Sequence, residues 1–263
     1  MTHQPRCQVV NFDPKLQTSD MRYLALACDY DGTLAADGHV SAETQDALLR
    51  LRGAGLRLIL VTGRELPELL QVFPPAELFD RVIAENGALC YYPSETRERV
   101  FAPAPPESFA IALRARGVRP LSIGRVLVAT LRPHEVVAAQ AIRELGLSLQ
   151  VILNKESVMI LPAGIDKATG LAAILPEMGL EFPHVVGIGD AENDATFLKR
   201  CGYSAAVANA LPALKEEVDF VTGQARGAGV VELIEHILAG DLPEARTRSF
   251  GQEGDGNEQL CGH

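Results

Sequence analysis

The sequence predicts an α/β protein with a Rossmann-like parallel-sheet core and a small inserted α+β cap domain. The first observation is that continuous apolar runs, such as residues 24–28 and 58–61, alternate with amphipathic helical segments. Strands that are buried on both faces of a parallel sheet have this continuous apolar character. The second observation is that residues 103–162 change to the order helix, strand, helix and two strands. This change indicates a second unit inserted into the first.

The predicted core elements begin with a strand at residues 23–29 and a helix at 41–55. Ser41 is placed to cap this helix, and Gly53 and Gly55 are placed to end it. Before the cap we expect a strand at 57–63, a helix at 65–73, a strand and turn at 81–87, and a β-hairpin at 88–101. After the cap we expect helices at 166–179, 191–202 and 229–240, with strands at 185–190, 204–207 and 219–222.

A proline-rich joint at residues 102–107 leads into the predicted cap. The cap is expected to contain helices at 107–116 and 133–146 and strands at 125–130, 147–153 and 157–162. A tight turn at Asn154–Lys155 would make its last two strands antiparallel. We therefore predict a leader at 1–20, a core at 21–102 and 163–240, a cap at 103–162 and a flexible tail at 241–263.

The composition of the chain limits the kinds of molecule that it is expected to bind. A net charge of −10 argues against nucleic acid and anionic membranes, whose phosphates select basic surfaces. The five cysteines are odd in number and scattered, which indicates free thiols in a reducing compartment. No apolar run reaches the length of a membrane span. These features predict a cytoplasmic protein that binds neither membranes nor nucleic acid.

Asp29 and Asp31 lie one residue apart at the end of the first buried strand. Strand side chains alternate between faces, so the two carboxylates are expected to point the same way. Like charges at this separation repel, and burial increases the cost. The pair therefore calls for a cation, a shared proton or a substrate beside it.

Other polar residues are expected at the same edge of the sheet. Thr62, Gly63 and Arg64 follow the second strand, and Asp190, Asn193 and Asp194 follow a late one. In an open parallel sheet, ligands bind beyond the carboxyl ends of the strands. Lys167 falls in the first turn of a helix, where the dipole disfavours a cation, so we expect negative charge near it. Together these residues predict a magnesium and phosphate site.

Chemical roles follow from the residue types. Asp29 is suited to attack phosphorus and form an aspartyl-phosphate, and Asp31 to protonate the leaving oxygen and then activate water. Thr62 and Gly63 are expected to hold phosphate oxygens at a helix start, and Lys167 to offset the charge of the transferred group. Asp29 and Asp190 are expected to ligate Mg²⁺, with Asn193 and Asp194 orienting the groups around it. Asp194 is therefore counted in the metal site, and Asn193 among the residues that bind the phosphate.

Four segments, "DYDGT", "VTGR", "GIDKATG" and "GIGDAENDATF", resemble the four ordered motifs of the haloacid dehalogenase-like phosphatase superfamily. The "AENGA" stretch and the inserted cap are similar to its Cof-type, class IIB branch. The resemblance implies that Asp29 is the nucleophile, that Asp31 is the acid/base, and that the main-chain carbonyl of Asp31 is a magnesium ligand. It also implies functional roles for Thr62, Lys167, Asp190 and Asp194.

Three functions are compatible with this pattern. The first is a magnesium-dependent phosphatase acting on a small phosphorylated metabolite, such as a sugar phosphate or phosphoglycolate. The second is a phosphomutase, which needs a second phosphate site in the cap; the cap arginines form no tight cluster, which favours hydrolysis. The third is a regulatory phosphoryl-binding module, but such a module does not need the second aspartate of the D-x-D pair.

Several residues stay open at this stage. Arg64 has two readings, a substrate contact or an ion pair with a surface acid, and residues 85–87 read as a hairpin turn or a substrate contact. Cys28 is expected to pack on the face of the strand opposite Asp29. Four polar cap residues are interpreted as solvated surface rather than as substrate contacts: Arg125, Arg132, Asn154 and Lys155.

Overall fold

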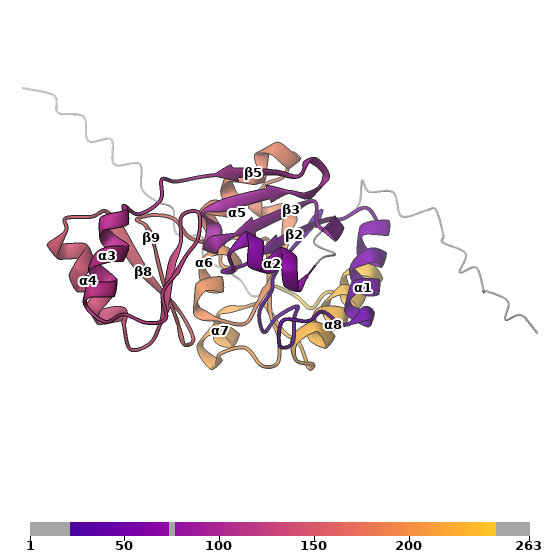
Figure 1. Cartoon of the computed structure of the whole chain (residues 1–263). Helices are drawn as coiled ribbons and strands as arrows, with labels where there is room; N and C mark the ends of the chain where they lie inside the picture. The colour runs from indigo at the N-terminus through magenta and orange to yellow at the C-terminus, as the bar shows by residue number, and fades with distance from the viewer. Residues whose placement is uncertain (1–21, 74–76, 246–263) are drawn as a thin grey trace, which may run out of the picture.

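The computed structural model describes residues 22–73 and 77–245 and is built on an eight-stranded sheet (Figure 1). The strand order is β12-β11-β10-β1-β2-β3-β4-β5. The strands are β1 (Ala25–Asp29), β2 (Arg57–Val61), β3 (Arg81–Ala84), β4 (Leu89–Tyr92), β5 (Arg97–Val100), β10 (Val185–Gly189), β11 (Tyr203–Ala206) and β12 (Phe220–Val221). The six strands from β12 to β3 pair in parallel, and β4 and β5 add an antiparallel edge.

Helices connect the parallel strands, as crossover connections in such a sheet require. Those between parallel strands are α1 (Ala42–Gly53), α2 (Leu66–Val72), α6 (Ala195–Leu198) and α7 (Pro212–Glu217). α5 (Lys167–Ile174) leads from the second sheet into β10, and α8 (Arg226–Ala239) follows the last strand. α1 and α8 pack side by side, and α5 packs against α6 (Figure 1). Ser41 caps α1 by accepting a hydrogen bond from the N–H of Thr44. The mostly parallel α/β core predicted from the apolar runs is confirmed.

Between β5 and α5 the chain forms a second sheet, which lies to the left of the core in Figure 1. Its strands pair antiparallel in the order β6-β7-β9-β8. The elements are α3 (Glu107–Ala115), β6 (Ser122–Ile123), β7 (Val128–Leu131), α4 (Glu135–Glu144), β8 (Leu149–Asn154) and β9 (Ser157–Pro162). This unit is the α+β cap, and the predicted turn between β8 and β9 is confirmed.

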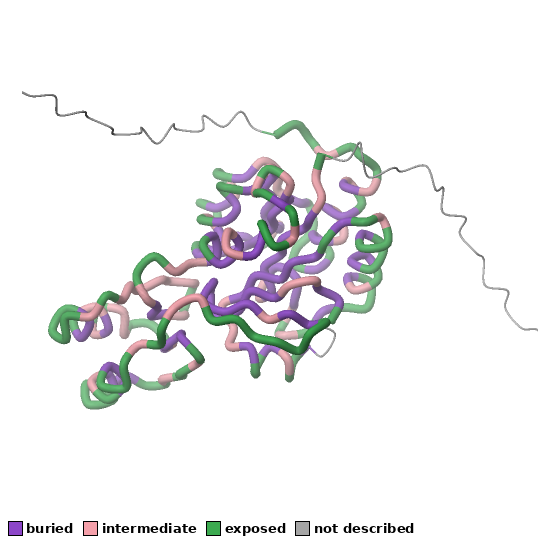
Figure 2. The backbone as a smooth tube through the Cα atoms, turned by 90° about the horizontal axis from the view of Figure 1, so that it is seen from above, coloured by how far each residue is buried: buried purple, intermediate pink, exposed green. Residues whose placement is uncertain are grey.

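The apolar cores of the two units are largely separate. Figure 2 shows buried residues gathered along the strands of the main sheet, with exposed stretches on the outer helices and edges. The cap has its own core, in which Phe109 and Leu113 of α3 pack with Ala138 and Ala141 of α4. A smaller cluster joins cap to core and includes Ala88 together with four cap residues: Val126, Leu127, Met159 and Leu161.

Some elements differ from the prediction. The helix expected at 191–202 is shorter, because a 3-10 turn at Glu192–Asp194 precedes the four-residue α6. The short β6, whose two residues are exposed, and the one-and-a-half-turn α7 were not predicted, since elements of this length leave little periodicity in a sequence. The predicted leader and most of the predicted tail lie outside the described residues, and the boundaries between core and cap stay predictions.

A close contact between two backbones fixes where α5 begins. Gly87 has a φ of +105°, and a Cβ at this position would lie 1.8 Å from the carbonyl oxygen of Asp166, the N-cap of α5. Asp166 accepts a hydrogen bond from the N–H of Thr169, and its own N–H donates to the Thr169 hydroxyl, which forms a capping box. The turn after β3 therefore sets the position of Lys167, the first residue of α5.

We expect Gly87→Ala to destabilise the protein more than Gly179→Ala. Gly179 also has a positive φ (+68°), but a Cβ there meets no atom within 4 Å, so its replacement reports the backbone cost alone, about 1 kcal/mol. The overlap at Gly87 should add about 1–3 kcal/mol. Urea unfolding of the two variants measures the difference, and equal free energies of unfolding would contradict the tight contact.

Candidate active site

The carboxyl ends of three adjacent strands form the base of the site. β1 pairs in parallel with both β2 and β10, so their ends lie at one edge of the sheet. Asp29 is the last residue of β1, Thr62 follows β2, and Asp190 follows β10. Residues from distant parts of the sequence meet here because parallel strands end on the same side.

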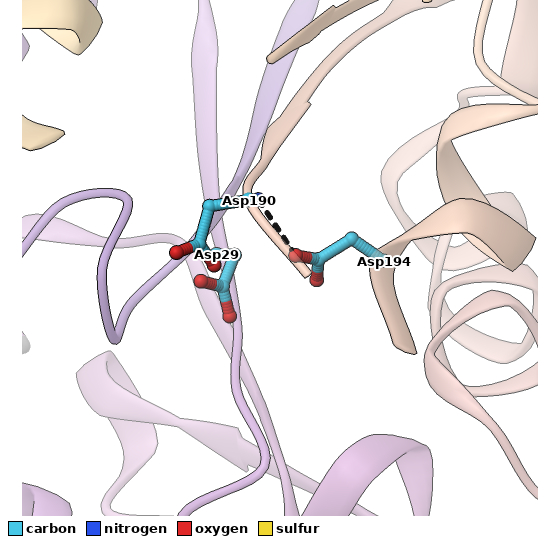
Figure 3. A group of neighbouring side chains, drawn as sticks. All are labelled: Asp29, Asp190 and Asp194. Atoms are coloured by element: carbon cyan, nitrogen blue, oxygen red, sulfur yellow. Dashed lines mark hydrogen bonds between the residues drawn. The ribbon is translucent and has the colours of Figure 1, made fainter. Parts of the chain in front are cut away.

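Three carboxylates gather at this edge, as the sequence predicted. Asp29, Asp190 and Asp194 each offer one oxygen within 4.8 Å of the others, and all three residues are buried (Figure 3). The Oδ2 of Asp194 accepts hydrogen bonds from the backbone N–H groups of Asp190 (2.9 Å) and Ala191 (3.0 Å). These bonds fix the loop that follows β10 and hold Asp190 beside Asp29.

Lys167 provides a compensating positive charge. Its Nζ donates to Asp29 Oδ1 and to Asp194 Oδ1, both at 2.6 Å, and the side chain is 1% exposed. Burial on its own would lower the pKa of Lys167, but Asp194 and Asp29 outweigh it and raise that pKa above its ordinary value. The expectation that this lysine lies beside negative charge is confirmed.

The crowded negative charge disfavours the ionised form of Asp29. Burial, together with the nearby Asp194 and Asp190 carboxylates, raises the pKa of Asp29 from 3.8 to about 8, although Lys167 opposes the shift. Burial also raises the pKa of Asp190, against the opposing effect of Lys155. The carboxylates therefore repel one another more than Lys167 can offset, and a further cation would reduce this repulsion.

Asp31 lies outside this carboxylate group, and its side chain is 41% exposed. The strand ends at Asp29, so the expected alternation does not continue to Asp31. Its two oxygens instead accept hydrogen bonds from Nε and Nη2 of Arg64, both at 2.7 Å. Arg64 also donates to Glu68 at 2.6 Å. Of the two readings of Arg64, the structure shows an ion pair, and its partner is Asp31.

Three of the residues predicted to bind phosphate are Thr62, Gly63 and Asn193, and each lies close to the strand ends. The Thr62 hydroxyl accepts a hydrogen bond from the N–H of Arg64 (3.1 Å) in a buried position, and Gly63 lines the cleft described below. Asn193 is buried as well, and its Nδ2 donates to Asn86 Oδ1 at 2.9 Å. The Oδ1 of Asn193 has no hydrogen-bond partner among the described residues. An unsatisfied buried acceptor of this kind is costly unless a ligand donates to it.

The interpretation of Lys155 as solvated surface is wrong. The Nζ of Lys155 lies 2.5 Å from Asp190 Oδ2. The β8–β9 turn that carries it reaches from the cap to the carboxyl end of β10. Charge and spacing in the sequence gave no sign of this contact, because it depends on how the cap docks on the core.

Glu85 and Asn86 are further residues whose contacts the sequence left open. They form the turn after β3, and both side chains are buried. The Glu85 carboxylate accepts hydrogen bonds from three consecutive cap N–H groups, those of Arg125, Val126 and Leu127, at 2.7–2.8 Å. In the sequence, the available sign of a role for Glu85 and Asn86 is their position directly after a strand that ends at the site.

A cleft of about 640 Å³ opens between core and cap above these residues. The core lines it with Asp29, Asp31, Gly32, Ala35, Asp37, Gly38, Gly63, Arg64, Glu65, Glu68 and Arg226. The cap lines it with Ser122, Leu127, Ala129, Asn154, Lys155, Glu156, Ser157 and Met159. Asp190 Oδ1 is buried close to Asp29, which lines the cleft, and has no hydrogen-bond partner among the described residues. Carboxylate oxygens and one unsatisfied acceptor are a donor set that fits Mg²⁺.

Comparison with known proteins places the chain in a family. A sequence model described as haloacid dehalogenase-like hydrolase matches residues 26–107 and 126–234. The chain belongs to the haloacid dehalogenase-like hydrolase family. This confirms the family that the four motifs resemble.

Among curated relatives, a phosphoglycolate phosphatase of Methanothermobacter thermautotrophicus is 31% identical over 222 residues, which are 81% of this chain and 98% of the relative. A phosphoglycolate phosphatase of Pyrobaculum aerophilum is 31% identical over 221 residues, covering 82% of this chain and 96% of the relative. This haloacid dehalogenase-like chain therefore aligns with such relatives over nearly their whole length.

Solved structures share the fold. A haloacid dehalogenase-like hydrolase from Bacteroides thetaiotaomicron superposes with a TM-score of 0.69 at 20% identity, covering 82% of this chain and 99% of the other. A subclass IIB sugar phosphatase of the superfamily gives a TM-score of 0.67 at 20% identity, covering 83% and 100%. These likenesses show that the chain shares the fold of both structures over most of its length.

Replacing Asp29 by Asn should stabilise the chelator-treated protein, and by more at alkaline pH. The raised pKa means that folded wild type keeps a proton that the unfolded chain releases above its ordinary value of 3.8. Wild-type stability therefore falls as pH rises from 3.8 towards 8, whereas Asn has no such proton. Thermal unfolding at about pH 5 and about pH 8 measures the gap in Tm between the two proteins.

Asp37→Asn is the control, because it removes an exposed carboxylate of the same cleft without relieving buried charge. A gap in Tm that is the same at both pH values would contradict the crowding of Asp29.

Proposed function

We propose that this chain, a phosphatase of small phosphorylated metabolites, works through phosphoryl transfer to Asp29 with Mg²⁺ as cofactor. The observation that carries the proposal is the buried group of Asp29, Asp190 and Asp194, with Lys167 bridging the first and last. Asp29, a member of this group, lines a cleft large enough for a small metabolite. This arrangement supports transfer of a negatively charged group to a carboxylate nucleophile.

In the first half-reaction, Asp29 attacks phosphorus and the bond to the leaving oxygen breaks. Lys167 holds Asp29 Oδ1, which leaves Oδ2 for the attack. The ammonium also offsets negative charge on the transferred group. The Thr62 hydroxyl, the Gly63 backbone and Asn193 are placed around the same strand ends and would hold phosphate oxygens.

Asp31 would donate a proton to the leaving oxygen and later take one from the attacking water. Both of its oxygens are held by Arg64, so this role requires Arg64 to release one of them. Glu68 already accepts from another nitrogen of the same guanidinium and can retain it during that release. Arg64 thus acts as a positioning residue for Asp31.

Mg²⁺ would be held by Asp29 and Asp190, with Asp194 beside them, and the family resemblance adds the main-chain carbonyl of Asp31. When bound, the ion supplies Lewis-acid stabilisation of the phosphoryl oxygens. The unsatisfied Asp190 Oδ1 and the raised pKa of Asp29 support a cation at this position.

Two alternatives receive less support. A phosphomutase needs a cap site for a second phosphate, but the cap residues that line the cleft include a single cation, Lys155, in the described part of the chain. A regulatory module that retains its phosphoryl group has no need of Asp31 in the cleft. The relatives named phosphoglycolate phosphatase support a small anionic substrate over a larger sugar phosphate.

We also infer a cytoplasmic location, which the buried free thiols Cys28, Cys90 and Cys201 support. Within the described residues, no helix is long and apolar enough to cross a membrane. The acidic net charge supports a small-molecule partner rather than nucleic acid.

Asp29→Asn is expected to abolish phosphate release while the protein remains folded, because the amide cannot serve as the nucleophile. The measurement is phosphate release from a panel of phosphorylated metabolites, with Mg²⁺ and with chelator. Wild type should release phosphate only with Mg²⁺. Substantial release by the folded variant would refute the nucleophile, and release undiminished by chelator would refute the cofactor.

Asp31→Asn is expected to lower kcat by about 10²–10⁴-fold, since general acid–base catalysis contributes on this order. Both half-reactions should slow, including hydrolysis of the phosphoenzyme. Rapid acid quenching followed by mass spectrometry measures phosphorylated Asp29 with time. Normal decay of that species in the variant would be inconsistent with Asp31 as the base.

A further inference from the structure

The turn between β8 and β9 brings a single cap cation to the catalytic carboxylates. Lys155 sits in this turn with a φ of +51° and is held by two contacts besides its ammonium. Its backbone N–H donates to Glu192 Oε2 (3.2 Å), and its carbonyl accepts from Arg132 Nε (3.1 Å). Glu192 belongs to the 3-10 turn that ends in Asp194. The backbone of Lys155 is therefore anchored to the turn that carries Asp194.

The Lys155 side chain reaches into the cleft rather than into bulk solvent. Nζ lies 2.5 Å from Asp190 Oδ2, and the Lys155 side chain is 43% exposed. Asp190, in turn, has an oxygen within 4.8 Å of one on Asp29. The ammonium and the proposed nucleophile thus both lie near the Asp190 carboxylate, so a short molecule can reach both.

The cleft otherwise disfavours anions. Six acidic residues line it: Asp29, Asp31, Asp37, Glu65, Glu68 and Glu156. Three cationic residues line it, and two of them, Arg64 and Arg226, come from the core. Arg64 is already paired with both Asp31 and Glu68. Lys155 is the single cationic residue that the cap contributes to the lining in the described part of the chain.

We propose that Lys155 determines specificity by binding a carboxylate on the leaving-group end of the substrate. On binding, the ammonium exchanges the carboxylate of Asp190 for that of the substrate and stays paired throughout. The inference rests on the proposed phosphatase function and names its substrate class: a phosphate monoester with a carboxylate one or two carbons from the ester oxygen.

Two features select this class. One ammonium matches a single carboxylate, whereas a second phosphate is bound by several cations or by arginine forks. The short path from Asp190 to Asp29 matches a short chain between the two anionic groups.

The test compares two phosphate esters of matched size, 2-phosphoglycolate and 2-hydroxyethyl phosphate. The first carries a carboxylate where the second carries a hydroxymethyl group. Calorimetry with Mg²⁺ present measures their binding to the inactive Asp29→Asn protein, with and without Lys155→Gln. Glutamine carries no charge and faces the same positive φ as lysine. Arg114→Gln, which removes an exposed charge from cap helix α3, is the matched control.

We expect Lys155→Gln to weaken 2-phosphoglycolate binding by about 10- to 100-fold, the range for losing a charge-assisted hydrogen bond. Binding of 2-hydroxyethyl phosphate should not change, and Arg114→Gln should affect neither ester. An equal loss for both esters, or no loss for either, would overturn the specificity role.

Turnover of p-nitrophenyl phosphate by the enzyme with Asp29 intact separates this inference from the proposed function. If turnover occurs but Lys155→Gln does not alter the preference between the esters, the specificity role is wrong and the phosphatase stands. If the preference depends on Lys155 but no ester is hydrolysed, the binding role stands and the phosphatase is wrong.

Discussion

The buried ammonium of Lys167 connects the two halves of the core sequence. It bridges Asp29, from the first strand, and Asp194, from the turn after β10, with almost no exposure to solvent. Removing the lysine would leave the buried carboxylates without their bridging cation, which is strongly destabilising. The position of Lys167 depends on the start of α5, and this depends on the close approach of Gly87 to Asp166. Three separate segments are therefore held in one arrangement by the charges that the chemistry uses, and the turn at Gly87 positions one of them through a backbone contact.

The cap is held by the same edge of the sheet. Glu85, directly after β3, accepts three backbone hydrogen bonds from residues 125–127, and Glu192, close to Asp190, accepts one from Lys155. In both contacts an acidic side chain of the core receives cap N–H groups. Cap placement and catalytic geometry thus depend on the same loops, those that follow the strands of the core.

The sequence was sufficient for the parts that topology decides. Asp29, Thr62 and Asp190 follow apolar strands, and parallel strands end at one edge, so their proximity could be predicted without a structure. Lys167 was predictable because a cation in a first helical turn needs an anion nearby. The pairing of Asp31 with Arg64 was left open because β1 ends at Asp29 and strand alternation no longer applies. The role of Lys155 was missed because its contact depends on how two separately folded cores dock, which no local pattern encodes.

Electrostatic balance explains why these elements depend on one another. The buried carboxylates carry more negative charge than Lys167 offsets, as the raised pKa of Asp29 shows. A phosphate monoester brings further negative charge into a cleft lined by twice as many acidic as cationic residues. Substrate can bind only if a cation compensates for it, and the structure offers Lys155 from the cap and oxygen ligands for Mg²⁺ from the core. Recognition of the substrate and assembly of the catalytic group are therefore two aspects of one charge balance.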